Sequence, residues 1–539
     1  MAFLVKGNKH HKRVVFQTRA MAEKQHLTVS SSSAKPAPNL GSKNQQSGFI
    51  IEELSQDDIE SITDENCLPS LSQPAPIMSA ATARAAMIPE VFKNLSPFRD
   101  LLNTQTSQAQ DKTVQECLPF LSGESADFKY YNYHGLPHLD RKRHIAFLHK
   151  SLKKLPAPYV VADAARPWMF YWALSGLTTM GEDVSEYRKR LMNTVRPIQN
   201  ESGGFGGGNG QMSHLAPTYA ILLSLAIVGG DEALGLIDRK AMWKWLGRLK
   251  QPDGGFQMSV GGEEDVRGAY CAVVIISLLN LPLDLPRDSP AWTESVPTLL
   301  TNLPEWVARC QTFEGGITCK PDAEAHGGYA FCALACLCIL GEPHVVIPKY
   351  LDVPRLVSWL SARQYSPEGG FAGRTNKLVD GCYSHWIGGC WPLVEACVKG
   401  PTMVSHHAKS TNLGSTDGSG DLYSREGLIR YILCCCQDVV KRGGLRDKPS
   451  HNSDSYHTCY VLAGLSSAQH KWNFNHLTAK GASGNLASPY HWNVEHVIRQ
   501  PQIYDEEDRV ETVHPVFVVP EGVAEATRAY FATTCAGWD

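Results

Sequence analysis

The sequence predicts an all-α fold, an α-α barrel (toroid) in which repeated helix pairs surround a central cavity. A glycine pair recurs along the chain, and an amphipathic helix is expected shortly before most of these pairs. A nearly continuous apolar stretch follows most of the pairs, which indicates a second helix that is buried on almost all sides. Many uncharged aromatic residues lie in these stretches, as expected for the lining of a barrel.

The glycine pairs mark the repeat. They are separated by roughly 50 to 75 residues, and such regular self-similarity is typical of repeat architectures. Glycine tolerates a positive φ and lets another backbone approach closely, so each pair predicts a tight turn. An aromatic or apolar residue follows each of them: Gly203-Gly204-Phe205, Gly254-Gly255-Phe256, Gly315-Gly316-Ile317, Gly369-Gly370-Phe371 and Gly443-Gly444-Leu445.

The expected helices alternate in character. Those before a glycine pair are amphipathic, for example 245–251 and 356–364, whereas those after a pair must be buried. Stacked pairs with one buried member form either an open solenoid or a closed ring. We expect the closed ring, because uncharged aromatic side chains would line its interior. The buried helices are expected at residues 220–228, 270–279, 329–340 and 457–465.

The repeats cover about residues 140–470, within a barrel domain expected over residues 76–539. Residues 1–75 are rich in Ser, Gln, Lys and Pro, which predicts a disordered tail. The basic residues at its start lack the apolar core of a signal peptide. The low-complexity stretch 401–424 is expected to be a surface loop inserted into the barrel.

The composition argues against several classes of function. The 539 residues carry a formal net charge of −3, so we expect no nucleic-acid partner. No apolar run reaches the roughly 18 residues of a membrane span, so we expect no integral membrane segment. The 16 cysteines lie mostly in apolar stretches and form no Cys-x-x-Cys pair. This usage is typical of reduced thiols in a cytoplasmic protein.

The segment 373–386 holds half of a metal site. Asp380 and Cys382 offer two anionic ligand atoms two residues apart. His457 occupies the corresponding position one repeat later, and adjacent repeats place corresponding residues side by side. Together they would bind a tetrahedral zinc with one open position, as catalytic sites do. In the alternative interpretation, Asp380 caps a helix and the other two residues fill the core.

The same segment carries groups that could bind a multiply charged anion. Arg374 and Lys377 stay protonated at neutral pH, and Tyr383 adds a hydroxyl. His326 of a neighbouring repeat would complete a set of donors suited to a departing diphosphate. Without an anion, the two cations would be a solvated face and His326 a turn residue. The aromatic residues of the buried helices would line a lipid pocket if the ring is hollow, and would otherwise be core: Trp168, Trp172, Tyr219, Tyr270, Tyr329, Trp386 and Tyr460.

From about residue 140 to its end, the chain resembles the β subunits of protein farnesyltransferases, fungal members in particular. Six motifs in the same order carry this resemblance: 163–168 (DAARPW), 203–219 (GGFGGGNGQMSHLAPTY), 265–267 (DVR), 324–332 (EAHGGYAFC), 373–386 and 447–460. The resemblance implies an α-α barrel that forms a heterodimer with a helical α subunit. It also implies transfer of farnesyl from farnesyl diphosphate to the cysteine thiol of a C-terminal CaaX motif, through a zinc-bound thiolate.

The resemblance assigns roles to individual residues. It implies one zinc ion (Zn2+) per β subunit, bound by Asp380, Cys382 and His457. It also implies magnesium (Mg2+), associated with Asp447, that assists departure of the diphosphate. The residues with catalytic roles would be Lys377, Tyr383, Asp447 and Asp454. Farnesyl diphosphate would contact His326, Arg374, Lys377, Tyr383, Trp386, Tyr270, Tyr329 and Cys332.

The resemblance further implies a peptide pocket made of Trp168, Trp172, His214, Ala216, Arg267 and Tyr456. Trp168 and Tyr460 stand where farnesyl-specific members block the pocket floor, which favours the fifteen-carbon isoprenoid. Asp447 points the same way, because relatives that use the longer isoprenoid carry Lys there. Two positions depart from the pattern and would retune the peptide pocket: Ala165 replaces an expected Ser, and His385 an expected aromatic residue.

Three alternatives remain open at this point. A geranylgeranyltransferase β subunit would prefer the longer isoprenoid diphosphate. A terpene cyclase would share the barrel but should carry an acidic motif such as DxDD or DDxxD, which the sequence lacks. A noncatalytic helical scaffold would need neither zinc nor the anion-binding residues.

Overall fold

A computed structural model describes residues 103–125, 127–401, 421–475, 486–497 and 502–534. The predicted tail 1–75 and all but the ends of the predicted insert 401–424 lie outside these residues. Within the described residues, no helix combines the length and the apolar character that crossing a membrane requires.

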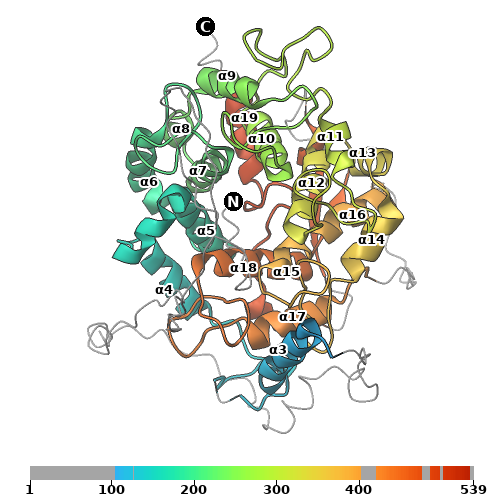
Figure 1. Ribbon diagram of the computed structural model, residues 1–539. Coiled ribbons are helices and arrows are strands. Elements are labelled where there is room, and N and C mark those ends of the chain that lie inside the picture. Colours follow the sequence, from blue (N-terminus) through green and yellow to red (C-terminus); the bar gives the residue numbers. More distant parts are fainter. Residues whose placement is uncertain (1–102, 126, 402–420, 476–485, 498–501, 535–539) are drawn as a thin grey trace, which may run out of the picture. The chain divides into compact units, whose positions relative to one another are not determined.

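The buried helices form a closed ring, which confirms the predicted barrel. They are α5 (Arg166–Thr179), α7 (Leu215–Val228), α10 (Val266–Leu278), α12 (Gly327–Leu340), α15 (Tyr383–Trp386) and α18 (Ser455–Gln469). Each of them packs against the next along the chain. The last, α18, packs against the first, α5, so the series of contacts returns to its start (Figure 1).

An outer layer supplies the second member of each helix pair. It consists of α4 (Arg141–Ser151), α6 (Arg188–Val195), α9 (Arg239–Leu249), α11 (Leu303–Arg309), α14 (Val353–Ser361) and α17 (Arg425–Cys435). Most of these helices are amphipathic, as predicted, but α17 has no exposed residue and also packs against α3 (Gln105–Leu121). On α9, for example, Trp245 and Leu249 are buried whereas Lys240 and Lys244 are exposed. The outer face of α9 is therefore polar, and its inner face is apolar and buried.

The glycine pairs hold successive repeats in register. A Cβ atom on Gly203 would lie 2.1 Å from the carbonyl oxygen of Ala241, and one on Gly204 would lie 2.8 Å from the Trp245 ring. Gly203 also has a φ of +94°, so glycine is required on both grounds. The other pairs meet an aromatic ring of the next outer helix in the same way: Trp306, Trp359, Tyr431 and, for the last pair, Phe147. Phe147 belongs to α4, so the last glycine pair closes the ring on the first outer helix.

Two features of the ring differ from a regular repeat. Helix α5 has no glycine pair before it, and for this reason the glycine pattern did not reveal it. The inner helix that follows Gly369-Gly370 is split into α15 and α16 (Cys390–Lys399). The split falls at Gly388 and Gly389, where a Cβ on Gly388 would lie 2.0 Å from the carbonyl oxygen of Ser384.

A short β-ribbon follows α18 and adds to the predicted all-α fold. Strand β1 (His470–Phe474) pairs antiparallel with β2 (Trp492–His496), and Phe474 lies opposite Trp492. The remaining α-helices are α3 (Gln105–Leu121), α8 (Asp231–Leu234), α13 (Pro343–Tyr350) and α19 (Val523–Thr533). Short 3-10 helices lie at Ala157–Ala165, Ser185–Tyr187, Arg196–Ile198, Ser488–Tyr490 and Glu506–Asp508.

The segment before α19 is bonded to two helices of the ring. The Tyr171 hydroxyl of α5 donates to the carbonyl oxygen of Val518 at 2.7 Å. The Tyr270 hydroxyl of α10 donates to that of Val516, also at 2.7 Å. Val516, Phe517 and Val518 are buried. Two ring helices are thus tied to one C-terminal segment.

An ion-pair cluster joins this C-terminal region to the start of the barrel. His138 Nδ1 lies 3.1 Å from Asp508 Oδ2 and 3.1 Å from Glu507 Oε1. The hydrogen bond to Asp508 raises the pKa of His138. A raised folded-state pKa stabilises the fold fully below the unfolded-state pKa, and this stability is lost as the pH rises through the folded-state pKa.

We therefore expect His138→Gln to destabilise the protein more at pH 5.5 than at pH 9. Thermal unfolding of both proteins at the two pH values measures this difference. The same loss of stability at both pH values would show that the charge of His138 contributes nothing.

Candidate active site

Three possible metal ligands from adjacent repeats come together, as predicted. Asp380 and Cys382 lie in the loop before α15, and His457 lies in the first turn of α18. Their ligand atoms all lie within 4.8 Å of one another. Cys382 is buried, and the other two residues are half-buried. A sulfur, a nitrogen and an oxygen donor at this spacing fit a tetrahedral zinc with one open position.

Asp454 orients the histidine of this cluster. Its Oδ1 accepts the His457 backbone N–H at 2.7 Å and caps α18. Its Oδ2 lies 2.7 Å from His457 Nδ1, so Nδ1–H donates to this carboxylate. The other ring nitrogen, Nε2, faces Asp380 Oδ1 at 3.2 Å. A carboxylate behind a histidine fixes the tautomer that presents Nε2 to a metal.

The charges of the cluster depend on one another. Burial opposes ionisation of Asp380, but the charge of His457 outweighs it and holds the Asp380 pKa well below its usual value. Burial also lowers the pKa of His457, yet Asp454 and Asp380 together raise it well above the usual value. Burial raises the pKa of the Cys382 thiol. A metal ion bound here would supply the positive charge that the His457 proton supplies to Asp380. It would also displace the proton of the Cys382 thiol.

His326 and Tyr383 form a hydrogen-bonded pair next to this cluster. The Gly328 backbone N–H donates to His326 Nδ1 at 3.1 Å, so the proton of the neutral ring is on Nε2. Nε2 lies 3.0 Å from the Tyr383 hydroxyl. Burial, together with Arg374 and Arg267, lowers the pKa of His326 to about 4, so the ring is neutral at pH 7. Because Nε2–H donates to the Tyr383 oxygen, the Tyr383 O–H can donate to an anion.

The two predicted cations lie on the more exposed side of this pair. Arg374 forms an ion pair with Glu324. It is still close enough to lower the pKa of His326 by its charge. Lys377 is exposed, and no ion pair of its ammonium occurs among the residues that the structure describes. The structure therefore brings His326, Tyr383 and Arg374 together and leaves Lys377 at the edge.

Gly373 leaves room for Tyr383. A Cβ atom on Gly373 would lie 2.0 Å from the Tyr383 ring.

We expect Gly373→Ala to displace this ring and to weaken binding of farnesyl diphosphate about tenfold or more, the equivalent of one hydrogen bond to a charged group. Fluorescence titration with a labelled isoprenoid diphosphate measures this. Gly208→Ala is the control, because its nearest atom would lie 3.3 Å away; unchanged affinity of the Gly373 variant would contradict the prediction.

Aromatic rings meet in a closed circuit inside the ring of helices. Consecutive centroids lie 4.5 to 5.9 Å apart, and the circuit returns to its first residue. In addition, Trp386 Nε1–H donates to the Tyr456 hydroxyl at 3.0 Å. Phe331 was not predicted, although it lies on a predicted buried helix. The circuit runs through Trp168, Tyr219, Tyr270, Phe331, Trp386, Tyr460, Tyr456 and Trp172. Such a wall is suited to an apolar chain.

Two further predicted isoprenoid contacts lie close to these groups. Tyr329 is half-buried, and its ring centroid lies 5.2 Å from that of His326. Cys332 is fully buried on α12, and burial raises its pKa well above the usual value. Tyr329 therefore lies next to the hydrogen-bonded pair.

The predicted peptide contacts outside the aromatic circuit are already engaged within the chain. His214 caps α7 by accepting the Ala216 N–H at Nδ1 (3.1 Å), and burial lowers its pKa to about 3. Arg267 Nε donates to Asp265 Oδ1 at 2.8 Å, and its guanidinium lies over the Tyr329 ring. The charge of Arg267 is thus compensated before any peptide binds. Ala165 stands at the N-cap of α5, where no side chain caps the helix.

His385 is packed against the aromatic circuit. Its ring stacks on Tyr460 at 5.2 Å and lies 4.4 Å from Phe331. Its Nε2 is buried without a hydrogen-bond partner in the described part of the chain. Burial lowers its pKa to about 3, so the ring is neutral. An unpaired buried polar atom costs about 1–3 kcal/mol.

We expect His385→Phe to stabilise the protein by about 1–3 kcal/mol, because it removes this unpaired nitrogen. Urea unfolding measures the effect. His514→Phe is the matched control: His514 is equally buried, but its Nε2 donates to Pro489 O at 3.0 Å and its Nδ1 accepts the Val516 N–H at 3.1 Å. That variant should lose stability. A loss in the His385 variant as well would mean that Nε2 has a partner.

Asp447 has a neighbour that sequence reasoning missed. Its Oδ1 lies 2.5 Å from Lys448 Nζ, and its Oδ2 lies 3.6 Å from His451 Nε2. Burial, with a contribution from Asp380, raises the pKa of Asp447 to about 6. Proteins commonly bind magnesium through one or two carboxylates together with phosphate oxygens, and Asp447 offers one such carboxylate. The position of Lys448, directly after a predicted catalytic residue, could have drawn attention to it.

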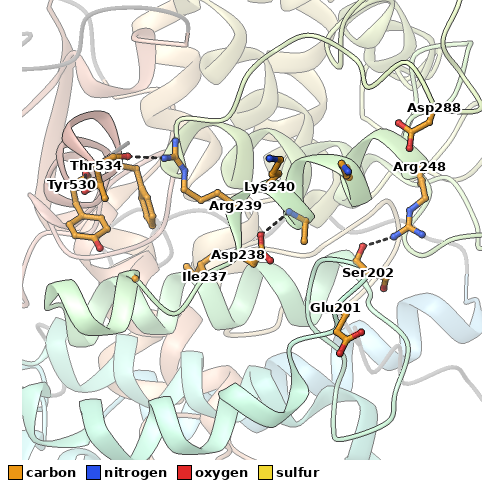
Figure 2. A pocket seen from close by; sticks show the side chains of 14 residues that line it. Glu201, Ser202, Ile237, Asp238, Arg239, Lys240, Arg248, Asp288, Tyr530 and Thr534 are labelled. Atoms are coloured by element: carbon orange, nitrogen blue, oxygen red, sulfur yellow. Dashed lines mark hydrogen bonds between the residues drawn. The ribbon is translucent and has the colours of Figure 1, made fainter. Parts of the chain in front are cut away.

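A cavity of about 770 Å3 lies elsewhere, between α9 and α19. Figure 2 shows its mixed lining, with Arg239 bonded to Thr534 and Arg248 bonded to Ser202. Asp288 and Glu201 also line it. None of the predicted site residues lines it, so it is separate from the chemistry described above.

Comparison with known proteins identifies the family of the chain. The family described as the prenyltransferase alpha-alpha toroid domain matches residues 139–519. The chain is 57% identical over 455 residues to protein farnesyltransferase subunit beta of Pyricularia oryzae, covering 84% of this chain and 85% of that protein. It is 38% identical to the Schizosaccharomyces pombe subunit of the same name, covering 79% and 97%.

A solved structure shares the fold. It is the Candida albicans protein geranylgeranyltransferase-I complexed with GGPP, with a TM-score of 0.54 at 20% identity, covering 73% of this chain and 99% of that chain. At this identity the likeness concerns the fold alone. From the family match and the two fungal relatives, the chain belongs to the family of protein farnesyltransferase β subunits.

Proposed function

We propose that this chain is the catalytic β subunit of a protein farnesyltransferase. It would transfer farnesyl from farnesyl diphosphate to the cysteine thiol of a protein with a C-terminal CaaX motif. One observation carries the proposal: the metal-ligand cluster and the anion-binding pair adjoin, because Cys382 belongs to the first and Tyr383 to the second. Nucleophile and leaving group would therefore meet at consecutive residues.

The metal cluster would prepare the nucleophile. A zinc ion bound by Asp380, Cys382 and His457 would lower the pKa of the substrate thiol, so that a thiolate exists at neutral pH. Asp454 would keep the His457 tautomer that presents Nε2. The aromatic residues beside the cluster, Trp172 and Tyr456, would contact the aliphatic part of the peptide.

The anion-binding residues would receive the leaving group. As the thiolate sulfur forms a bond to C1 of the isoprenoid, the C1–O bond breaks and the diphosphate gains charge. The Tyr383 O–H would donate to it, while His326 stays neutral and orients Tyr383. Arg374 and Lys377 would neutralise the remaining charge, with magnesium held near Asp447. The farnesyl chain would lie along the aromatic circuit.

Further properties follow from the same proposal. Trp168 and Tyr460 would limit the isoprenoid to fifteen carbons by filling the floor of the pocket. A helical α subunit would complete the enzyme, and exposed apolar side chains near two glycine turns, Met212 and Phe313, suit such an interface. A reducing, cytoplasmic location suits the free cysteines among the described residues.

The proposal is tested by co-expression with a farnesyltransferase α subunit. The purified complex should contain one zinc per heterodimer and should farnesylate a CaaX peptide. Farnesyl diphosphate should outcompete geranylgeranyl diphosphate when both are present. A preference for the longer substrate would indicate a geranylgeranyltransferase, and a zinc-free, inactive complex would leave only the scaffold.

A further inference from the structure

Lys448 is a buried cation for which neither the sequence analysis nor the proposed function has a role. It is 4% exposed, and Asp447, with which it pairs, is 5% exposed. Lys448 Nζ lies 2.5 Å from Asp447 Oδ1. Two charged groups that are both buried need to be paired closely, because a lone buried charge is strongly unfavourable. The fold has thus placed a counter-ion on the predicted magnesium carboxylate.

The backbone fixes this pair beside the metal-ligand cluster. The Gly381 N–H donates to the carbonyl oxygen of Asp447 at 2.9 Å, and Gly381 stands between the two ligands Asp380 and Cys382. The Tyr431 hydroxyl donates to the same carbonyl oxygen at 2.8 Å. Asp447 therefore cannot move away from the cluster without breaking two hydrogen bonds.

The two carboxylate oxygens of Asp447 have different neighbours. Oδ1 is engaged by the Lys448 ammonium, whereas Oδ2 faces His451 Nε2 at the longer distance of 3.6 Å. A divalent cation that bound Oδ1 would have to displace the ammonium, because two cations cannot occupy one place. A cation that bound Oδ2 alone would meet a carboxylate whose charge is already partly neutralised.

We propose that Lys448 is a built-in competitor of magnesium: it neutralises Asp447 while no metal is bound, and its displacement sets the concentration of divalent metal that the leaving-group site needs. This inference rests on the proposed function. Lys448 is a positioning residue here, because it acts on the substrate through Asp447. Its long side chain lets the ammonium swing aside while its backbone stays in place.

Removing the competitor should strengthen metal binding. Lys448→Met keeps the length of the side chain and removes the charge, so Asp447 should bind a divalent cation about 10- to 100-fold more tightly, the equivalent of one charge-assisted hydrogen bond. Lys448→Arg keeps the charge and should stay close to the wild type. The rate of farnesyl transfer without magnesium should fall in Lys448→Met, since nothing then neutralises Asp447 beside the departing diphosphate.

The experiment uses the heterodimer loaded with zinc and farnesyl diphosphate at pH 8. Electron paramagnetic resonance titration with Mn2+ measures the affinity of the divalent site, and single-turnover transfer without magnesium gives the metal-independent rate. Tighter Mn2+ binding in Lys448→Met but not in Lys448→Arg supports the proposal. Equal Mn2+ affinity in the wild type and Lys448→Met would overturn it. Lys448→Gln repeats the comparison should the methionine variant not fold.

Two controls separate this inference from the proposed function. Asp447→Asn should abolish binding of Mn2+, and this result would place the ion at that carboxylate. Unchanged binding would overturn the inference. Zinc content and affinity for farnesyl diphosphate should be the same in the wild type and all Lys448 variants. A wild-type complex without zinc or transfer activity would refute the proposed function, whereas normal zinc and transfer with no effect of Lys448 on Mn2+ refutes the inference alone.

Discussion

Cys382→Ala is expected to remove zinc from the heterodimer and to lower farnesyl transfer by more than about 100-fold. Mutating a group behind a metal ligand already costs roughly 10- to 100-fold, so loss of the ligand itself should cost at least as much. Without the sulfur, Asp380 and His457 are too few ligands for a structural or catalytic zinc. Zinc analysis and a single-turnover assay measure the two effects.

The same variant should still bind farnesyl diphosphate almost normally. The residues proposed to hold the diphosphate, His326 and Tyr383, keep their own hydrogen bond, and His326 is fixed by the cap of α12 rather than by the metal ligands. Cys434→Ala, another buried thiol, is the control for the loss of a core sulfur and should keep both zinc and activity. Simultaneous loss of zinc and isoprenoid binding in Cys382→Ala would argue against two separable half-sites.

The sequence was sufficient to predict the repeat because the same close contact recurs along the chain. Each glycine pair needs a residue without a side chain, since the next outer helix approaches closely, as Ala241 and Trp245 do at Gly203 and Gly204. This requirement recurs in every repeat that has a pair, so the interval itself reveals the repeat, whereas the expectation of a closed ring rested on the aromatic residues of the buried helices. The position of His457 beside Asp380 followed from the same register, without knowledge of any side-chain contact.

The remaining side-chain contacts depend on which of several possible partners a residue meets. The sequence pattern does not contain this information. Arg374 can reach either an anion or Glu324, and in the structure it pairs with Glu324. Lys448 is adjacent to Asp447 in the chain, but only burial makes their pairing obligatory. The break between α15 and α16 falls at Gly388 and Gly389, and the glycine pairs that mark the repeat do not predict it.

Lys377→Ala is expected to slow the chemical step by roughly 100- to 1000-fold, the range found when one donor to a developing charge is removed. Lys377 is exposed and is not paired with a carboxylate among the described residues, so it can turn toward charge that appears only as the C1–O bond breaks. Binding of farnesyl diphosphate should weaken far less, because an exposed cation contributes little in the ground state.

The effects of Lys377→Ala on the rate and on the affinity are separated by single-turnover rates and equilibrium titration. Lys349→Ala, an exposed lysine on α13, should change neither. An effect on affinity as large as that on the rate would mean that Lys377 binds the ground state, and the selective stabilisation of the transition state would be refuted.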